Sequence, residues 1–231
     1  MTDFNLTPAD HLGAVTRDLR DGERDGHPLR VLVVQRDFAA ARLEVWDALT
    51  TRERIPRWFA PVTGDLQLGG RYQIEGNAGG EVLACEEPAG FEITWEYDGQ
   101  LSWVEVMLSE IGSGCRLRLE HSAPVSPQMW EQFGPGAVGM GWEMMLMGLA
   151  EHFASPDFSA AEAQATMTTP DGMAWIGQVM AGSSSAWGTA DAAFGTDPAR
   201  ASAAAGRCLA AYTGQDPAES DTTGGASQGG S

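Results

Sequence analysis

The chain has 231 residues, enough for one domain or two small ones, and its hydrophobic fraction of 43% is ordinary for a globular protein. Its charge is unusual, because 32 acidic residues outweigh 14 basic residues, all of them arginine, and give a formal net charge of −18. A field of this sign repels phosphate backbones and anionic lipid headgroups, so we expect no nucleic-acid partner and no membrane partner.

The N-terminal part of the chain predicts strands followed by short helices. Residues 1–28 are polar and charged, and the alternation over 15–19 is compatible with an edge strand. The first strong strand is expected at 29–38, which contains a β-branched run. Apolar residues at helical spacing predict a short helix over 43–49. A second short piece, 52–58, contains a proline and cannot continue far as a helix.

The middle of the chain is typical of an antiparallel meander. Apolar and polar residues alternate over 91–97, 102–108 and 115–119, and glycines separate these segments. Asp98-Gly99 is a favoured hairpin turn. Several short strands joined by tight turns favour a meander over parallel strand–helix–strand units.

After residue 124 the apolar period becomes helical. The longest predicted helix spans about 136–154 and ends before a Ser-Pro pair. The alanine-rich stretch that follows predicts two or three further helices, at about 158–167, 171–193 and 197–212. Residues 214–231 are rich in Gly, Ser and Asp, and we expect this tail to be disordered.

Together these elements indicate an α+β fold in which a curved sheet buries one face against a helix laid across it. Four runs resemble the signature of the SRPBCC or START-like superfamily, in the branch of heat-shock ATPase-activator homologues (AHSA-type): Val45–Thr50, Arg54–Phe59, Gly64–Tyr72 and Gly90–Trp95. The resemblance implies a helix-grip (START-like) fold, a curved antiparallel sheet wrapped around a long C-terminal helix, with an internal cavity between them. The expected organisation is an N-terminal polar segment, a START-like domain, a helical extension and a tail, at residues 1–28, 29–154, 155–213 and 214–231.

Members of this superfamily bind hydrophobic small molecules, act as cyclases or aromatases, or act as co-chaperones. The resemblance therefore implies that the cavity binds a small hydrophobic or amphipathic molecule. One alternative is a cyclase- or aromatase-type enzyme that uses general acid–base residues in the same cavity, for which His121, Glu105 and Tyr72 are the candidates. Another is an ATPase-activating, co-chaperone-like interaction protein. A homodimer contact or a protein partner would be expected on 155–213.

The candidate cavity residues are mostly aromatic. Methionine suits irregular pockets, and ligand sites are concave and mainly apolar. By its strand alternation His121 shares a face with Leu119, and we place it at the cavity mouth as a polar contact. Plain core packing, or a strand-end histidine with satisfied hydrogen bonds, is the alternative for each residue. The candidates are Trp58, Phe59, Trp95, Trp103, His121, Trp142 and Met145.

No motif in the sequence argues for catalysis, a metal or a cofactor. The run 134–139 satisfies G-x-G-x-x-G, but it lacks the preceding strand and the surrounding strand–helix–strand unit of a dinucleotide site. We interpret it as a flexible start of the long helix, whose glycines let the backbone pass close to the sheet. The three cysteines are scattered and form no C-x-x-C pair. With no secretory signal and no apolar run near the ~20 residues of a membrane span, we expect a soluble, cytoplasmic protein.

Overall fold

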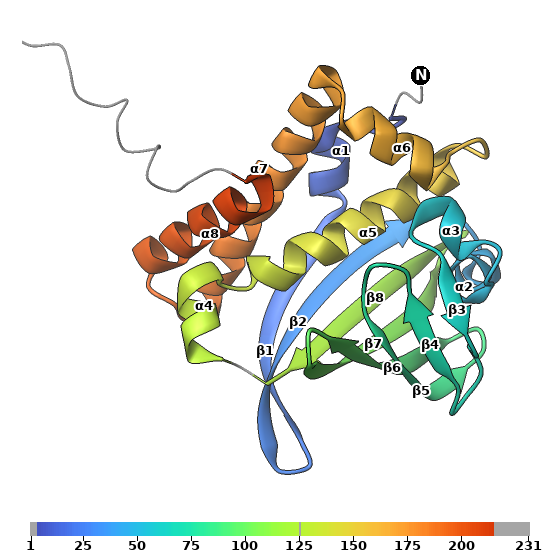
Figure 1. The fold of residues 1–231 in the computed structure, drawn as a ribbon, viewed down its shortest axis with the longest axis horizontal. Helices are drawn as coiled ribbons and strands as arrows, with labels where there is room; N and C mark the ends of the chain where they lie inside the picture. The colour runs from blue at the N-terminus through green and yellow to red at the C-terminus, as the bar shows by residue number, and fades with distance from the viewer. Residues whose placement is uncertain (1–3, 125, 215–231) are drawn as a thin grey trace, which may run out of the picture.

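An eight-stranded antiparallel sheet forms the centre of the protein, in the order β1-β2-β8-β7-β6-β5-β4-β3 (Figure 1). The structure is a computed structural model, and it describes residues 4–124 and 126–214. The predicted tail after Gly214 lies outside the described residues. The strands are β1 (Val15–Arg24), β2 (His27–Phe38), β3 (Val62–Gly64), β4 (Arg71–Ile74), β5 (Gly79–Glu86), β6 (Gly90–Tyr97), β7 (Gln100–Ile111) and β8 (Gly114–Ala123).

Two tight hairpins set the register of neighbouring strands: Asp25-Gly26 joins β1 to β2, and Asp98-Gly99 joins β6 to β7. Asp98 and Gly99 both have positive φ, 49° and 72°, and they join β6 to β7 between the paired residues Tyr97 and Gln100. A two-residue hairpin turn of this kind needs both central residues in the left-handed region, which Asp and Gly tolerate best. The predicted turn is therefore confirmed, and the meander from β5 to β8 follows from it.

The helix α5 (Gly136–Ala154) crosses the concave face of the sheet, with α2 (Arg42–Thr50) and α3 (Ile55–Trp58) near one end (Figure 1). Val34, Val104 and Leu119 from the sheet and Leu146 and Leu149 from α5 are all buried in one core cluster. This arrangement confirms the predicted α+β helix-grip fold.

Further helices lie beyond α5 on the side away from the sheet (Figure 1). They are α1 (Pro8–Gly13), α4 (Pro127–Phe133), α6 (Ala160–Met167), α7 (Pro170–Phe194) and α8 (Pro198–Thr213). The last three lie close to their predicted bounds. None of the helices in the described part of the chain is both long and apolar enough to cross a membrane.

The helices α1 and α4 were not predicted, although the sequence carries a signal for each. Thr7 caps α1, where Asp10 N donates to Thr7 Oγ1 at 3.2 Å and Thr7 N donates to Asp10 Oδ2 at 2.9 Å. Ser126 caps α4 by accepting a hydrogen bond from Met129 N at 3.4 Å, and a proline follows each cap at the first helical position. A capping residue followed by proline is a known helix start.

The glycines at the start of α5 serve a different purpose from the one predicted. A Cβ on Gly139 would lie 2.2 Å from Cε2 of Trp187 in α7, so the missing side chain admits an indole that is fully buried. The prediction that these glycines bring the backbone close to the sheet was wrong. They bring α7 close to α5 instead.

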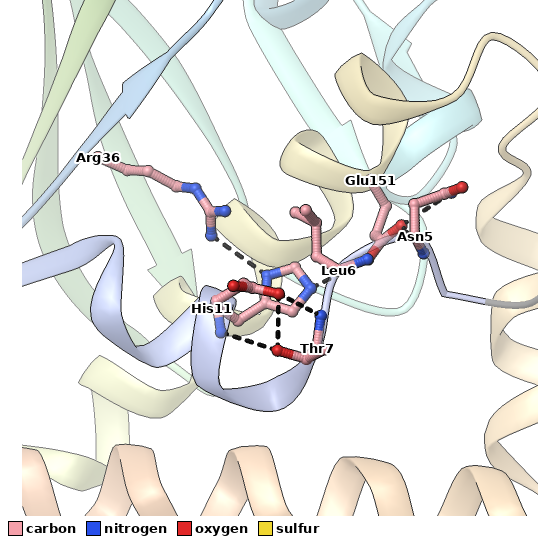
Figure 2. A network of polar contacts seen from close by, with 7 residues as sticks. Asn5, Leu6, Thr7, His11, Arg36 and Glu151 are labelled. Atoms are coloured by element: carbon pink, nitrogen blue, oxygen red, sulfur yellow. Dashed lines mark hydrogen bonds and ion pairs between the residues drawn. The ribbon is translucent and has the colours of Figure 1, made fainter.

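A buried polar network ties the N-terminal segment to α5 (Figure 2). Glu151 of α5 accepts hydrogen bonds from Asn5 N at 2.8 Å, Leu6 N at 3.1 Å and His11 Nε2 at 3.0 Å. Arg36 donates to His11 Nδ1 at 3.2 Å, and because arginine can only donate, the His11 proton sits on Nε2. Burial alone would raise the pKa of Glu151, but the hydrogen bonds from His11, Asn5 and Leu6 hold it below its ordinary value. Because its carboxylate oxygens are engaged, we interpret this network as a structural anchor.

Candidate functional site

A cavity of about 540 Å³ lies between α5, the short helices α2 and α3, and the concave face of the sheet. Every strand from β4 to β8 contributes at least one lining side chain. The lining is mainly apolar and rich in aromatic rings. It comprises Trp46, Leu49, Thr50, Ile55, Trp58, Phe59, Val62, Leu66, Gln67, Leu68, Tyr72, Ile74, Val82, Cys85, Glu87, Phe91, Ile93, Trp95, Val104, Val106, Leu117, Leu119, Trp142 and Met145.

The mouth of the cavity lies where its lining residues are exposed. Leu68 has 65% of its surface exposed, and Gln67, Cys85 and Glu87 are exposed as well. Leu68 belongs to the loop between β3 and β4, and Cys85 and Glu87 stand at the end of β5. The cavity therefore opens to solvent between this loop and the end of β5.

Trp58 and Phe59 form one wall, and two contacts hold them. Trp58 Nε1 donates to the carbonyl oxygen of Ala48 in α2 at 2.9 Å, and the two rings stack with centroids 5.6 Å apart. Gly148 of α5 lies directly against this wall, because a Cβ there would come within 2.3 Å of the Trp58 carbonyl oxygen. Glycine at this position therefore lets α3 approach α5 closely enough to narrow the cavity.

The opposite wall is built from Trp95 and Trp142, whose ring centroids lie 4.8 Å apart. Trp142 Nε1 donates to His121 Nδ1 at 2.8 Å. An indole nitrogen can only donate, so Nδ1 carries the lone pair and the His121 proton sits on Nε2. That proton reaches Ser102 Oγ at 2.8 Å, and Ser102 in turn donates to the Trp95 carbonyl oxygen at 3.1 Å.

This chain of hydrogen bonds fixes the chemistry of His121. Both ring nitrogens are engaged, and burial lowers the pKa of His121 from 6.5 to about 4. The imidazole is therefore neutral at physiological pH, with neither a free lone pair nor a free proton to offer a ligand. It orients the Trp142 indole that faces the cavity, and it does not line the cavity itself.

The polar groups deep in the cavity are also satisfied. Tyr72 donates its hydroxyl to the Thr94 carbonyl oxygen at 2.7 Å, and burial raises the pKa of this phenol above its ordinary range. Thr50 Oγ1 donates to the Trp46 carbonyl oxygen at 2.8 Å. The interior thus presents mainly apolar and aromatic surface.

Five of the seven candidate residues from the sequence line this cavity: Trp58, Phe59, Trp95, Trp142 and Met145. His121 lies behind Trp142 instead of at the mouth. Trp103 lies on the opposite face of the sheet, where Arg24 stacks over its ring at 4.6 Å, so its placement in the cavity was wrong. Glu105 shares that outer face, between its cross-strand neighbours Glu92 and Glu120.

Sequence reasoning missed several lining residues, although the signal was present. Phe91 and Ile93 alternate with polar residues in step with Trp95, so all three share one face of β6. Trp46 lies within a run that carries the family resemblance. Leu68 also lies within such a run, Gly64–Tyr72. The mouth residues Cys85 and Glu87 had no such signal, because they stand at a strand end that only the fold brings to the cavity.

The structure gives no support for a metal or a nucleotide at this site. Within residues 4–124 and 126–214, no three His, Cys, Asp or Glu side chains are grouped so as to hold a metal ion. The glycine-rich start of α5 packs against Trp187 of α7 and Cys208 of α8, so these glycines serve helix packing.

The comparisons with known proteins agree with this geometry. The family model described as Activator of Hsp90 ATPase homolog 1-like protein matches residues 39–154. The crystal structure of CalU16 from Micromonospora echinospora is 37% identical, with a TM-score of 0.54, and the match covers 72% of this chain and 98% of that one. Its solution NMR structure gives 35% identity and a TM-score of 0.57 over 74% and 97% of the two chains.

A more distant likeness supports the fold alone. DynU16, from the dynemicin biosynthetic locus, is 20% identical with a TM-score of 0.50, and the match covers 55% of this chain and 48% of that one. No curated protein matches the sequence.

Proposed function

The chain belongs to the family of Activator of Hsp90 ATPase homolog 1-like proteins, and from this membership and its cavity we propose that it binds a hydrophobic small molecule between the sheet and α5. The observation that carries the proposal is the cavity of about 540 Å³, which the surrounding side chains leave unfilled. Its volume falls within the ~300–1,000 Å³ typical of ligand sites. It is more than three times an engineered apolar cavity of about 150 Å³ that takes up benzene.

The lining favours binding over acid–base catalysis. A cyclase or aromatase would need at least two polar side chains converging on the substrate. Both nitrogens of His121 are engaged, Glu105 lies on the outer face of the sheet, and the Tyr72 hydroxyl is committed to Thr94. The three residues named for catalysis therefore do not meet in the cavity.

Mass spectrometry of the freshly purified protein tests for a natural ligand. We expect the native mass to exceed the denatured mass, because an apolar cavity of this size would retain a hydrophobic molecule through purification. Identifying the released molecule would name its chemical class. Equal masses would require the second test below.

The second test is a titration with the neutral fluorescent probe N-phenyl-1-naphthylamine. Wild-type protein is expected to bind it, and Ile93→Trp is expected to bind at least tenfold more weakly, because the larger side chain occupies the cavity. Met107→Trp is the matched control, since Met107 is also half-buried but lies on the other face of β7 from the lining residue Val106. Absence of binding to the wild type, or equal losses in the two variants, would contradict the proposal.

A further inference from the structure

We infer that the cavity selects amphiphiles whose polar end is a cation, such as a basic nitrogen, over amphiphiles that end in a carboxylate. The inference rests on the proposed function and specifies the ligand class. Among the described residues that line the cavity, Glu87 alone carries a formal charge at neutral pH.

Glu87 stands where a ligand headgroup would be. It is exposed at the mouth beside Cys85, while the lining residues Trp58, Trp142 and Val104 are buried. A molecule that inserts its apolar body would leave its polar end at this rim. The Glu87 carboxylate can meet a positive headgroup there without leaving water, so no large desolvation cost opposes the ion pair.

An anionic headgroup would find no counter-ion in the same place. None of the arginines among the described residues lines the cavity. Of the three arginines in the segment that leads to Trp58, Arg52 is engaged with the Gly64 carbonyl oxygen and Arg54 with Asp47, and Arg57 is exposed outside the cavity lining. A ligand carboxylate would therefore lie beside Glu87 with no cation to offset it, in the field of a chain with net charge −18.

The aromatic lining acts in the same direction. Trp58, Trp95 and Trp142 all line the cavity, and tryptophan faces attract cations through their ring quadrupole. A basic nitrogen that enters more deeply than the mouth would still meet favourable ring surface, whereas a carboxylate would meet the same ring faces unfavourably.

Three probes of equal chain length test the inference: decylamine, decan-1-ol and decanoate, each used to displace N-phenyl-1-naphthylamine at pH 7.5. We expect decylamine to bind about two- to fivefold more tightly than decan-1-ol, which is the upper part of the range for an ion pair that stays hydrated. We expect decanoate to bind more weakly than decan-1-ol. In Glu87→Gln the advantage of the amine should fall to less than twofold, and decanoate should gain affinity.

The matched control is Glu86→Gln, which removes the same charge from the neighbouring residue of β5. Glu86 is exposed and does not line the cavity, so the amine should keep its advantage. Equal affinities of the three probes, or equal effects of the two variants, would overturn the inference and leave the binding function intact. Failure of all probes, including the neutral dye, would instead overturn the proposed function.

Discussion

His121→Asn is expected to flatten the loss of stability that the protein suffers when it is acidified from pH 7 to pH 4.5. Burial lowers the pKa of His121 to about 4 in the folded protein, whereas an unfolded chain restores the ordinary value of 6.5. Below pH 6.5 the unfolded state therefore takes up a proton that the folded state refuses. The neutral imidazole therefore makes its full contribution to the free energy of unfolding above pH 6.5, and this contribution is lost as the pH falls toward 4.

The size of the effect follows from the two pKa values. Each pKa unit corresponds to about 1.4 kcal/mol, so the difference between 6.5 and about 4 amounts to roughly 3 kcal/mol over the whole window. This is a large fraction of the stability of an ordinary domain, which is about 5–15 kcal/mol. Asparagine does not titrate, and its amide oxygen can still accept the hydrogen bond from Trp142 Nε1.

Urea unfolding at pH 7.5, 6.5, 5.5 and 4.5 measures the free energy of unfolding for both proteins. His152 also contributes to the slope, because burial and the nearby Arg54 and Arg57 lower its pKa. That contribution is common to wild type and variant, so the difference between the two profiles isolates His121. The variant should be less stable at pH 7.5 and should lose about 2 kcal/mol less than the wild type by pH 4.5.

The matched control is His27→Asn, since His27 is exposed at the start of β2 and should leave the profile unchanged. Parallel profiles for wild type and His121→Asn would refute the reasoning, because they would mean that the imidazole is accessible to protons in the folded state. The same outcome would reopen His121 as a group able to exchange protons with a ligand.

Three further predictions concern the frame of the cavity. Gly148→Ala should lower the free energy of unfolding by several kcal/mol, because its Cβ would lie 2.3 Å from the Trp58 carbonyl oxygen. Gly141→Ala on the same helix is the control, since its Cβ meets nothing closer than 3.6 Å and the change should be neutral or slightly stabilising. Equal effects of the two variants would contradict the close contact at Gly148. Glu151→Gln should destabilise the protein by roughly 3 kcal/mol, because it replaces a buried carboxylate and weakens its hydrogen bonds to the N-terminal segment. Faster proteolysis near the N-terminus should accompany the loss. Unchanged stability would count against the interpretation of this network as a structural anchor. Cys85 should react with a thiol reagent within minutes while the two buried cysteines do not, and a bound cavity ligand should slow this reaction; a rate indifferent to ligand would show that Cys85 does not stand at the mouth.

The fold could be predicted because its signals are local or follow a simple period. The alternation of Phe91, Ile93 and Trp95 determines one face of β6, and Asp98-Gly99 determines the turn that follows it. The long apolar period of 136–154 determines α5. Each of these patterns acts over a few residues, so the chain carries the information in one place.

The cavity could be predicted only in part. Alternation along a strand shows which residues share a face, but it does not show which of the two faces points into the cavity. Trp103 was placed in the cavity for its aromatic side chain, yet it alternates with Val104 and Val106, which line the cavity. Its ring therefore had to face outward. The alternation was visible in the sequence and outweighs side-chain type as a guide to orientation.

The partners of His121 and Glu151 could not have been predicted. His121 meets Trp142 and Ser102, which lie 21 and 19 residues away, and Glu151 meets Asn5 at a separation of 146 residues. No period or spacing in the sequence encodes such contacts. They arise when α5 settles on the sheet and brings distant side chains within reach of one another.

The position of α5, between the sheet and the further helices, also decides where the chain could be shortened without exposing buried surface. The family match begins at residue 39, but β1 (Val15–Arg24) and β2 (His27–Phe38) lie before it and supply two strands of the sheet. A fragment limited to 39–154 would bare the edge of β8 and would leave Glu143 of α5 without Arg17, which now holds it through two contacts of 2.6 Å. We therefore expect the smallest piece of this protein that folds by itself to be larger than the part that the family model matches. A design that moves the cavity into another protein would therefore have to include the β1–β2 hairpin and the helices that pack beyond α5.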